Sequence, residues 1–150
     1  MPVPRIIALP FTGSTDIGQL AVAEGVNLPF NIGRVYWTFD VPASKIRGHH
    51  AHHELEQLIV AVSGTIEFVI ETSDRKRHSF LLDHPAKALY IPKLCWREIK
   101  FNAGAVLVCM ASLQYDEADY IRSYYDFVKL VDGLHENENQ QAPVVAANKL

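Results

Sequence analysis

The sequence has few cysteines and no concentrated positive charge, and both features exclude classes of protein. Cys95 and Cys109 are the only two cysteines in 150 residues, and both lie in apolar surroundings. Two such residues indicate reduced thiols in a core, as in a cytoplasmic protein, and not the disulfide framework of a small secreted domain. The densest positive charge, Arg75 to His78, is typical of a hairpin turn, and a net charge of -3 predicts no nucleic-acid partner.

Long apolar runs are also missing. No stretch approaches the about 20 residues that a membrane-spanning helix needs. Residues 1–10 contain proline and arginine where a signal peptide would be apolar. At 150 residues and 49% hydrophobic composition, one domain with a real core is the natural expectation. We therefore expect a cytoplasmic protein with no membrane partner.

A strand–helix–strand rhythm is absent up to Ser112. Short apolar or alternating segments separated by turn residues predict an all-β fold, an antiparallel sandwich or barrel. Residues 11–17, which contain glycine, serine and aspartate, are expected to form a loop. The expected strands are residues 5–9, 19–24, 33–40, 56–62, 65–71, 78–82, 88–91, 95–101 and 105–112, with a further extended segment at His50 and His52.

The pattern changes near the carboxyl end. Residues 116–128 begin acidic and repeat apolar side chains at helical spacing, which predicts one or two short helices. The polar composition of residues 134–150 predicts a mobile tail, which leaves residues 1–133 as a single domain. Within the strand at 33–40, two sets of residues alternate, and we expect Trp37 to lie in the core.

Four of the seven histidines fall within residues 49–53. His50 and His52 are two positions apart, so on an extended backbone their side chains point the same way, roughly 6.6 Å apart along the strand. Glu56 follows His52 by four positions and Gly64 follows Glu56 by eight. A pair of imidazoles on one face favours a functional site over solvated histidines at the end of a strand.

This spacing resembles the first motif of the cupins, metal-binding β-barrels, and implies a jelly-roll fold. The second cupin motif, Pro-x-Gly-x-x-His, ends in a further metal ligand, but its counterpart runs from Pro92 to Arg97. Arginine offers only donors and keeps its charge, so it cannot ligate a metal. We therefore expect no metal and no other cofactor, and an anionic ligand with acid–base chemistry instead. Glu56 would then either orient a histidine or be a remnant of a metal site.

Further motifs extend the resemblance over about residues 5–130. With them, the chain resembles the sugar 3,4-ketoisomerases, which are WxcM-like cupins that act on dTDP-4-keto-6-deoxyglucose without a metal. The motifs are Arg34-Val-Tyr-Trp, Arg47-Gly-x-His-x-His, Leu55-Glu-Gln, Leu89-Tyr-Ile-x-x-x-x-Trp96 and Tyr115-Asp-Glu-x-Asp-Tyr-Ile-Arg-x-Tyr.

The resemblance implies that the keto group of dTDP-4-keto-6-deoxy-D-glucose moves from C4 to C3 through an enediol. The product would supply the biosynthesis of deoxyamino sugars, as in lipopolysaccharide or S-layer glycans. The family pattern assigns catalysis to His50, His52 and Tyr36. It also implies a homodimer with exchanged N-terminal strands. The substrate-binding candidates are Arg34, Arg47, Arg97, Trp96 and Glu56.

Two other functions remain open at this point. A 3,5-epimerase-like cupin would also abstract protons next to a keto group, although that family pairs its histidine with an aspartate elsewhere and lacks the His-x-His strand. A sugar-binding cupin without catalytic activity is the other alternative. No helix-turn-helix segment accompanies the domain, which argues against a DNA-linked sensor.

Overall fold

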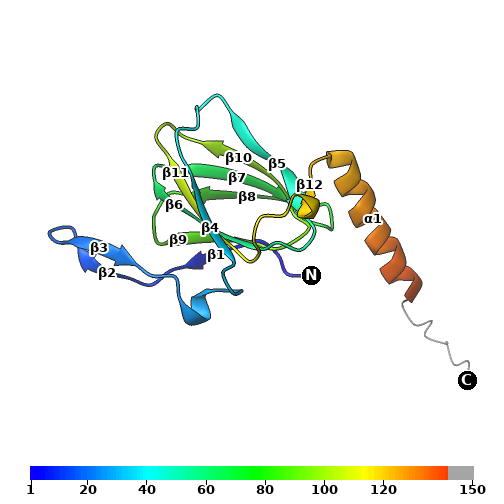
Figure 1. The fold of residues 1–150 in the computed structure, drawn as a ribbon, viewed down its shortest axis with the longest axis horizontal. Coiled ribbons are helices and arrows are strands. Elements are labelled where there is room, and N and C mark those ends of the chain that lie inside the picture. Colours follow the sequence, from blue (N-terminus) through cyan, green and yellow to red (C-terminus); the bar gives the residue numbers. More distant parts are fainter. Residues whose placement is uncertain (142–150) are drawn as a thin grey trace, which may run out of the picture.

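Two five-stranded antiparallel sheets pack face to face (Figure 1) in the structure, a computed structural model that describes residues 1–141. The strand order is β1-β9-β6-β11-β4 in the first sheet and β12-β5-β10-β7-β8 in the second. The first sheet contains β1 (Arg5–Ala8), β4 (Arg34–Thr38), β6 (Gln57–Ser63), β9 (Lys87–Ile91) and β11 (Val106–Ala111). The second contains β5 (Ile46–His52), β7 (Ile66–Glu71), β8 (Arg77–Leu82), β10 (Trp96–Phe101) and β12 (Tyr120–Ile121). This arrangement confirms the predicted all-β sandwich.

The main core lies between the sheets, where alternate residues of each strand point inward. Phe68 and Phe101 come from the second sheet, Ile59 and Leu107 from the first, and all four are almost fully buried. Burial of one such side chain stabilises the fold by about 1.5–3 kcal/mol. The core therefore holds the two sheets at a fixed spacing and supports the side chains at their open edge.

The N-terminal residues 11–21 form a hairpin that projects from the sandwich (Figure 1). Its strands are β2 (Phe11–Ser14) and β3 (Gly18–Ala21), so the prediction of a loop over residues 11–17 is wrong for residues 11–14. Gly13 explains the difference: its φ is +112°, and a Cβ there would lie 2.1 Å from the carbonyl oxygen of Gly18. Glycine thus permits two strands to pair where its presence suggested a loop. The short 3-10 helix η1 (Gly25–Asn27) follows.

One long helix closes the described chain, instead of the predicted one or two short ones. It is α1 (Tyr124–Gln141), and it follows the 3-10 helix η2 (Glu117–Asp119) and strand β12. The tail predicted from residue 134 is therefore helical as far as residue 141, and residues 142–150 lie outside the described part. Tertiary contacts support the start of the extension, because Leu134 packs against the buried cluster around Trp96 and Phe127. In addition, Nε2 of His135 lies 2.8 Å from the carbonyl oxygen of Ser73.

A polar contact also fixes α1. The hydroxyl of Tyr124 donates to the carboxylate of Glu71, at 3.0 Å from each oxygen, and Glu71 is only 4% exposed. Arg75 pairs with the same carboxylate at 2.7 Å. Among residues 1–141, no helix is both long and apolar enough to cross a membrane.

The two faces of β4 differ in an unexpected way. Arg34, Tyr36 and Thr38 point inward and are half-buried, whereas Val35, Trp37 and Phe39 are 51%, 64% and 59% exposed. The prediction that Trp37 lies in the core is therefore wrong. The alternation itself was identified correctly, but the polar set faces the space between the sheets because that space contains a polar cavity.

Candidate active site

A β-bulge in β5 aims the paired histidines into the sandwich. Arg97 on β10 pairs with His50, the next residue Glu98 pairs with Gly48, and His49 is left as the extra residue with φ of +52°. Gly48 has φ of +90°, and a Cβ there would lie 2.6 Å from the carbonyl oxygen of Arg97. Only glycine permits β5 to approach β10 so closely at this point, and the bulge re-aims the side chains that follow.

His50 and His52 lie side by side, as the His-x-His spacing predicts. Their ring centroids are 5.0 Å apart at an interplanar angle of 87°. The Nδ1 atom of His50 is 2.9 Å from the carbonyl oxygen of Gly48, and Nδ1 of His52 is 3.1 Å from Oδ2 of Asp119. Both oxygens can only accept, so each Nδ1 carries the hydrogen and each Nε2 is left with a free lone pair. The two imidazoles therefore share the tautomer that a general base needs.

Asp119 ties the second histidine to the backbone around it. Its carboxylate accepts the amide hydrogens of Glu54 at 2.8 Å and Leu55 at 3.2 Å, in addition to His52. Tyr120, the next residue, packs against both imidazoles, with centroid distances of 5.2 Å to His50 and 4.3 Å to His52. Residues 119 and 120, which are distant in sequence, thus fix the orientation of the histidines.

The histidines are held neutral by their surroundings. Burial, followed by the nearby guanidinium of Arg97, lowers the pKa of His50 to about 4. The same two causes lower the pKa of His52 to about 2, and His52 is 1% exposed. At neutral pH both groups are uncharged and can accept a proton.

Arg97 is buried at the closed end of the site, with 1% of its surface exposed. One of its terminal nitrogens donates to Oε1 of Gln57 and the other to the carbonyl oxygen of Cys95 at 2.8 Å, while Nε has no partner among the described residues. No carboxylate pairs with this cation in residues 1–141. A buried cation without a counter-ion favours an anionic or strongly polarised ligand beside it.

A cavity of about 350 Å³ opens from these residues between the sheets. Four arginines line it, and none of its lining residues is acidic. Arg122 is paired with Glu117. Arg34, Arg47 and Arg97 have no carboxylate partner among residues 1–141, and this imbalance gives the cavity a positive potential that suits a phosphorylated ligand. The lining residues are Arg34, Tyr36, Thr38, Arg47, Gly48, His50, Gln57, Ile59, Arg97, Ile99, Phe101, Leu107, Tyr120 and Arg122.

Two of the predicted substrate-binding residues lie outside this cavity. Trp96 is 5% exposed and packs against Tyr124 and Phe127 of α1, with centroid distances of 5.3 and 5.9 Å. Glu56 accepts a hydrogen bond from Tyr90, which belongs to the apolar cluster on the opposite side of the first sheet. Trp96 thus docks the helix, and Glu56 neither orients a histidine nor contacts the cavity. Arg34, Tyr36, Arg47, His50 and Arg97 all line it, with His52 directly behind.

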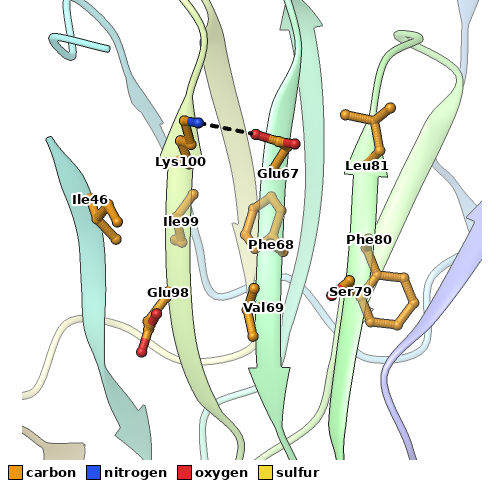
Figure 2. Close-up of a pocket in the computed structure, with 10 residues that line it drawn as sticks. All are labelled: Ile46, Glu67, Phe68, Val69, Ser79, Phe80, Leu81, Glu98, Ile99 and Lys100. Atoms are coloured by element: carbon orange, nitrogen blue, oxygen red, sulfur yellow. Dashed lines mark ion pairs between the residues drawn. The ribbon is translucent and has the colours of Figure 1, made fainter. Parts of the chain in front are cut away.

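A second cavity, of about 400 Å³, lies on the outer face of the second sheet (Figure 2). Figure 2 shows Ile46, Val69 and Leu81 on three strands of this face, together with the ion pair between Glu67 and Lys100, whose charged atoms are 3.9 Å apart. Its lining contains no histidine, tyrosine or arginine. It lacks a group that titrates near neutral pH and has no excess of cations, so the first cavity is the better candidate for chemistry.

The donor set at the first cavity does not suit a metal ion. Within residues 1–141 there is no group of three or more His, Cys, Asp or Glu side chains arranged to hold one. Arg97 occupies the place where a cupin would supply a further histidine, and it would repel a cation. The same atoms suit acid–base chemistry on an anion.

Sequence reasoning missed four residues that the structure brings to the site: Gln57, Asp119, Tyr120 and Arg122. All four fall inside the motifs at residues 55–57 and 115–124 that carry the family resemblance, so a signal was present. Their roles could not be assigned because they depend on contacts between residues up to 67 positions apart.

Comparisons with known proteins agree with this site. The family model FdtA, described as WxcM-like, C-terminal, matches residues 3–132. The TDP-4-oxo-6-deoxy-alpha-D-glucose-3,4-oxoisomerase of Aneurinibacillus thermoaerophilus is 38% identical over 113 residues, which cover 75% of this chain and 81% of that protein.

Two solved structures are similar in fold and in sequence. QdtA, a sugar 3,4-ketoisomerase from Thermoanaerobacterium thermosaccharolyticum in complex with TDP, matches with a TM-score of 0.81 at 32% identity, over 87% of this chain and 96% of QdtA. The TDP-quinovose 3,4-ketoisomerase WlaRB from Campylobacter jejuni matches with a TM-score of 0.78 at 37% identity, over 84% and 97%. The predicted resemblance is confirmed, and the chain belongs to the FdtA, WxcM-like family whose relatives include the sugar 3,4-ketoisomerases.

Proposed function

We propose that this protein is a sugar-nucleotide 3,4-ketoisomerase that converts a TDP-linked 4-keto-6-deoxyhexose into the 3-keto isomer. The observation that carries the proposal is a pair of neutral imidazoles with free Nε2 atoms, of which His50 lines a cavity that four arginines also line and His52 lies directly behind it. A base of this kind suits removal of a proton next to a carbonyl, and the arginines suit a diphosphate. The named relatives act on, or bind, TDP-linked compounds.

We assign each residue its role from its position relative to the cavity. His50, which lines the cavity, removes the proton from C3 to give an enediol, and the imidazolium so formed returns a proton, or in D₂O the deuteron for which it exchanges, to C4. His52, held by Asp119, lies behind His50 as its partner in proton transfer. Tyr36 moves a proton between the two oxygens, so that the hydroxyl hydrogen lost at C3 is matched by one gained at C4. Each positioned group contributes roughly 10²–10⁴-fold to the rate.

The arginines divide between the two ends of the substrate. Arg47 is exposed and Arg34 half-buried, and both suit the diphosphate at the entrance. Arg97 is buried at the closed end beside Tyr36 and the histidines, so we assign it to the oxygens of the sugar and not to the diphosphate. There it would stabilise negative charge on an enediolate oxygen.

We also propose that the protein works as a cytoplasmic homodimer. Two buried free cysteines suit a reducing compartment. The exposed apolar side chains on the outer face of β4, together with Phe11 and Leu20 of the projecting hairpin, which are 54% and 62% exposed, favour a second copy as partner. β1 pairs with β9 of its own chain, so the hairpin β2–β3 is the segment we expect to exchange. Residues 1–133, together with the part of α1 that continues to Gln141, then act as one domain.

The test is isomerisation in D₂O with EDTA present, using TDP-4-keto-6-deoxyglucose and NMR of the sugar. Formation of a 3-keto sugar with deuterium at C4 is the expected result. Exchange at C3 and C5 with inversion would indicate an epimerase instead, and binding without exchange would indicate a sugar-binding protein. Loss of turnover on addition of EDTA would contradict the metal-free chemistry.

A further inference from the structure

Gln57 is a buried amide that joins three polar groups at the closed end of the cavity. It begins β6 and is 3% exposed. Its Oε1 accepts a hydrogen bond from Arg97, and its Nε2 donates to the hydroxyl oxygen of Tyr36 at 2.8 Å and lies 3.5 Å from Sγ of Cys109. A buried polar side chain with partners at both ends is held in one orientation.

The direction of these hydrogen bonds is fixed by chemistry. A guanidinium group has donors and no acceptor, so the oxygen of the amide must face Arg97. The NH₂ group must then face Tyr36, because the opposite orientation would place donors against donors. The position of Arg97 therefore determines which atom of Gln57 reaches the phenol.

This direction has a consequence for Tyr36. Its oxygen accepts the hydrogen bond from Gln57, so its own hydrogen points elsewhere. Burial raises the pKa of Tyr36, and the phenol stays protonated at neutral pH. The other neighbour, Sγ of Cys109, is only a weak acceptor. The hydroxyl hydrogen thus remains available to an oxygen atom in the cavity.

We propose that Gln57 is a positioning residue that turns the phenol of Tyr36 into a proton donor for the sugar oxygens and couples its orientation to Arg97. This proposal rests on the proposed ketoisomerase activity. It explains why the position holds an amide and not a carboxylate. A carboxylate would accept the hydrogen of Tyr36, and it would also neutralise the cation that, together with the larger effect of burial, lowers the pKa of His50.

The test compares Gln57→Glu and Gln57→Met with Gln140→Glu, the same charge change on the exposed end of α1. For both Gln57 variants we expect kcat to fall about 100-fold with KM unchanged, because a proton-transfer group is misdirected while the diphosphate site is intact. In Gln57→Glu, NMR titration should also show a higher pKa for His50. Gln57→Glu keeps a hydrogen-bond acceptor for Arg97, so this variant still tests the proposal if Gln57→Met fails to fold.

Two outcomes would overturn the proposal while the proposed function stands. One is wild-type turnover with unchanged kcat in both Gln57 variants. The other is a fall in apparent kcat that is fully explained by a smaller fraction of folded protein, with the pH profile of the remaining activity unchanged. A measurement in the ligand-free protein separates the two ideas: the 13Cζ signal of Tyr36, assigned with Tyr36→Phe, should move in the Gln57 variants. If it does not move, the positioning role is wrong, whether or not the wild-type protein isomerises the sugar.

Discussion

The two faces of β4 differ in the polarity and in the exposure of their side chains. The inward face carries Arg34 and Tyr36 toward the cavity, and the outward face exposes Val35, Trp37 and Phe39. In an ordinary sandwich the apolar face would be inside. In the function proposed above, this strand serves two surfaces, a polar one for the substrate and an apolar one for a second copy of the chain, and the predictions below test each face.

The largest effect is expected at the inward-facing histidines. His50→Asn removes the base with the free Nε2 and should lower kcat by roughly 10²–10⁴-fold, with the melting temperature little changed. His49→Asn is the matched control, because His49 is exposed and asparagine tolerates its φ of +52°. Rates are measured by NMR of the sugar. Full activity in a variant that combines His50→Asn and His52→Asn would rule out the mechanism.

A smaller effect is expected at the entrance of the cavity. Arg47→Ala removes an exposed cation from the lining, and we expect KM to rise by roughly 10- to 100-fold with kcat nearly unchanged, since a charge-assisted hydrogen bond to phosphate is worth about 1.5–3 kcal/mol. Lys45→Ala, at an exposed position outside the lining, is the control. The effect should shrink at high salt. A fall in kcat with constant KM would place Arg47 at the reacting sugar instead.

The pH profile tests whether the closed end of the cavity keeps its bases neutral. An ordinary histidine, with a pKa near 6.5, would lose about tenfold in activity between pH 7.5 and 5.5. Because the pKa of His50 is lowered to about 4, kcat/KM should change less than about twofold over that range and fall only as pH drops through about 4. An acid limb near pH 6.5 would contradict this account.

The same shift affects stability, with a definite sign. The unfolded chain takes up a proton on His50 below pH 6.5, whereas the folded protein does so only near pH 4. The free energy of unfolding should therefore decrease as pH falls from 6.5 toward 4. A thermal melt at each pH distinguishes lost activity from lost fold.

The sequence predicted the chain's alternating strands and the paired histidines because both depend on local spacing. Period-2 alternation identified β4, and the two-residue separation placed His50 beside His52. Which face of a strand lies inside is decided by the whole sandwich, and for that reason Trp37 was placed wrongly. The contact between His52 and Asp119 spans 67 positions, so no local spacing predicts it, although Asp119 itself lies inside a motif of the family. Likewise, the helix past residue 133 is supported by contacts of Leu134 with the buried cluster and of His135 with Ser73, which residues 134–141 cannot reveal by themselves.

The smallest effect on catalysis, and the clearest on assembly, is expected on the outward face of β4. Trp37→Ser removes an indole that is 64% exposed in the single chain, so it should leave kcat per site unchanged while shifting the protein from dimer to monomer at low concentration. Light scattering coupled to size-exclusion chromatography measures the shift. Leu81→Ser is the control, because Leu81 is also exposed but lies on the outer face of the other sheet. If Trp37→Ser and Leu81→Ser weaken the dimer equally, the second subunit does not dock on the outward face of β4. Lost turnover in a Trp37→Ser protein that remains dimeric would mean that the two faces of β4 are not independent.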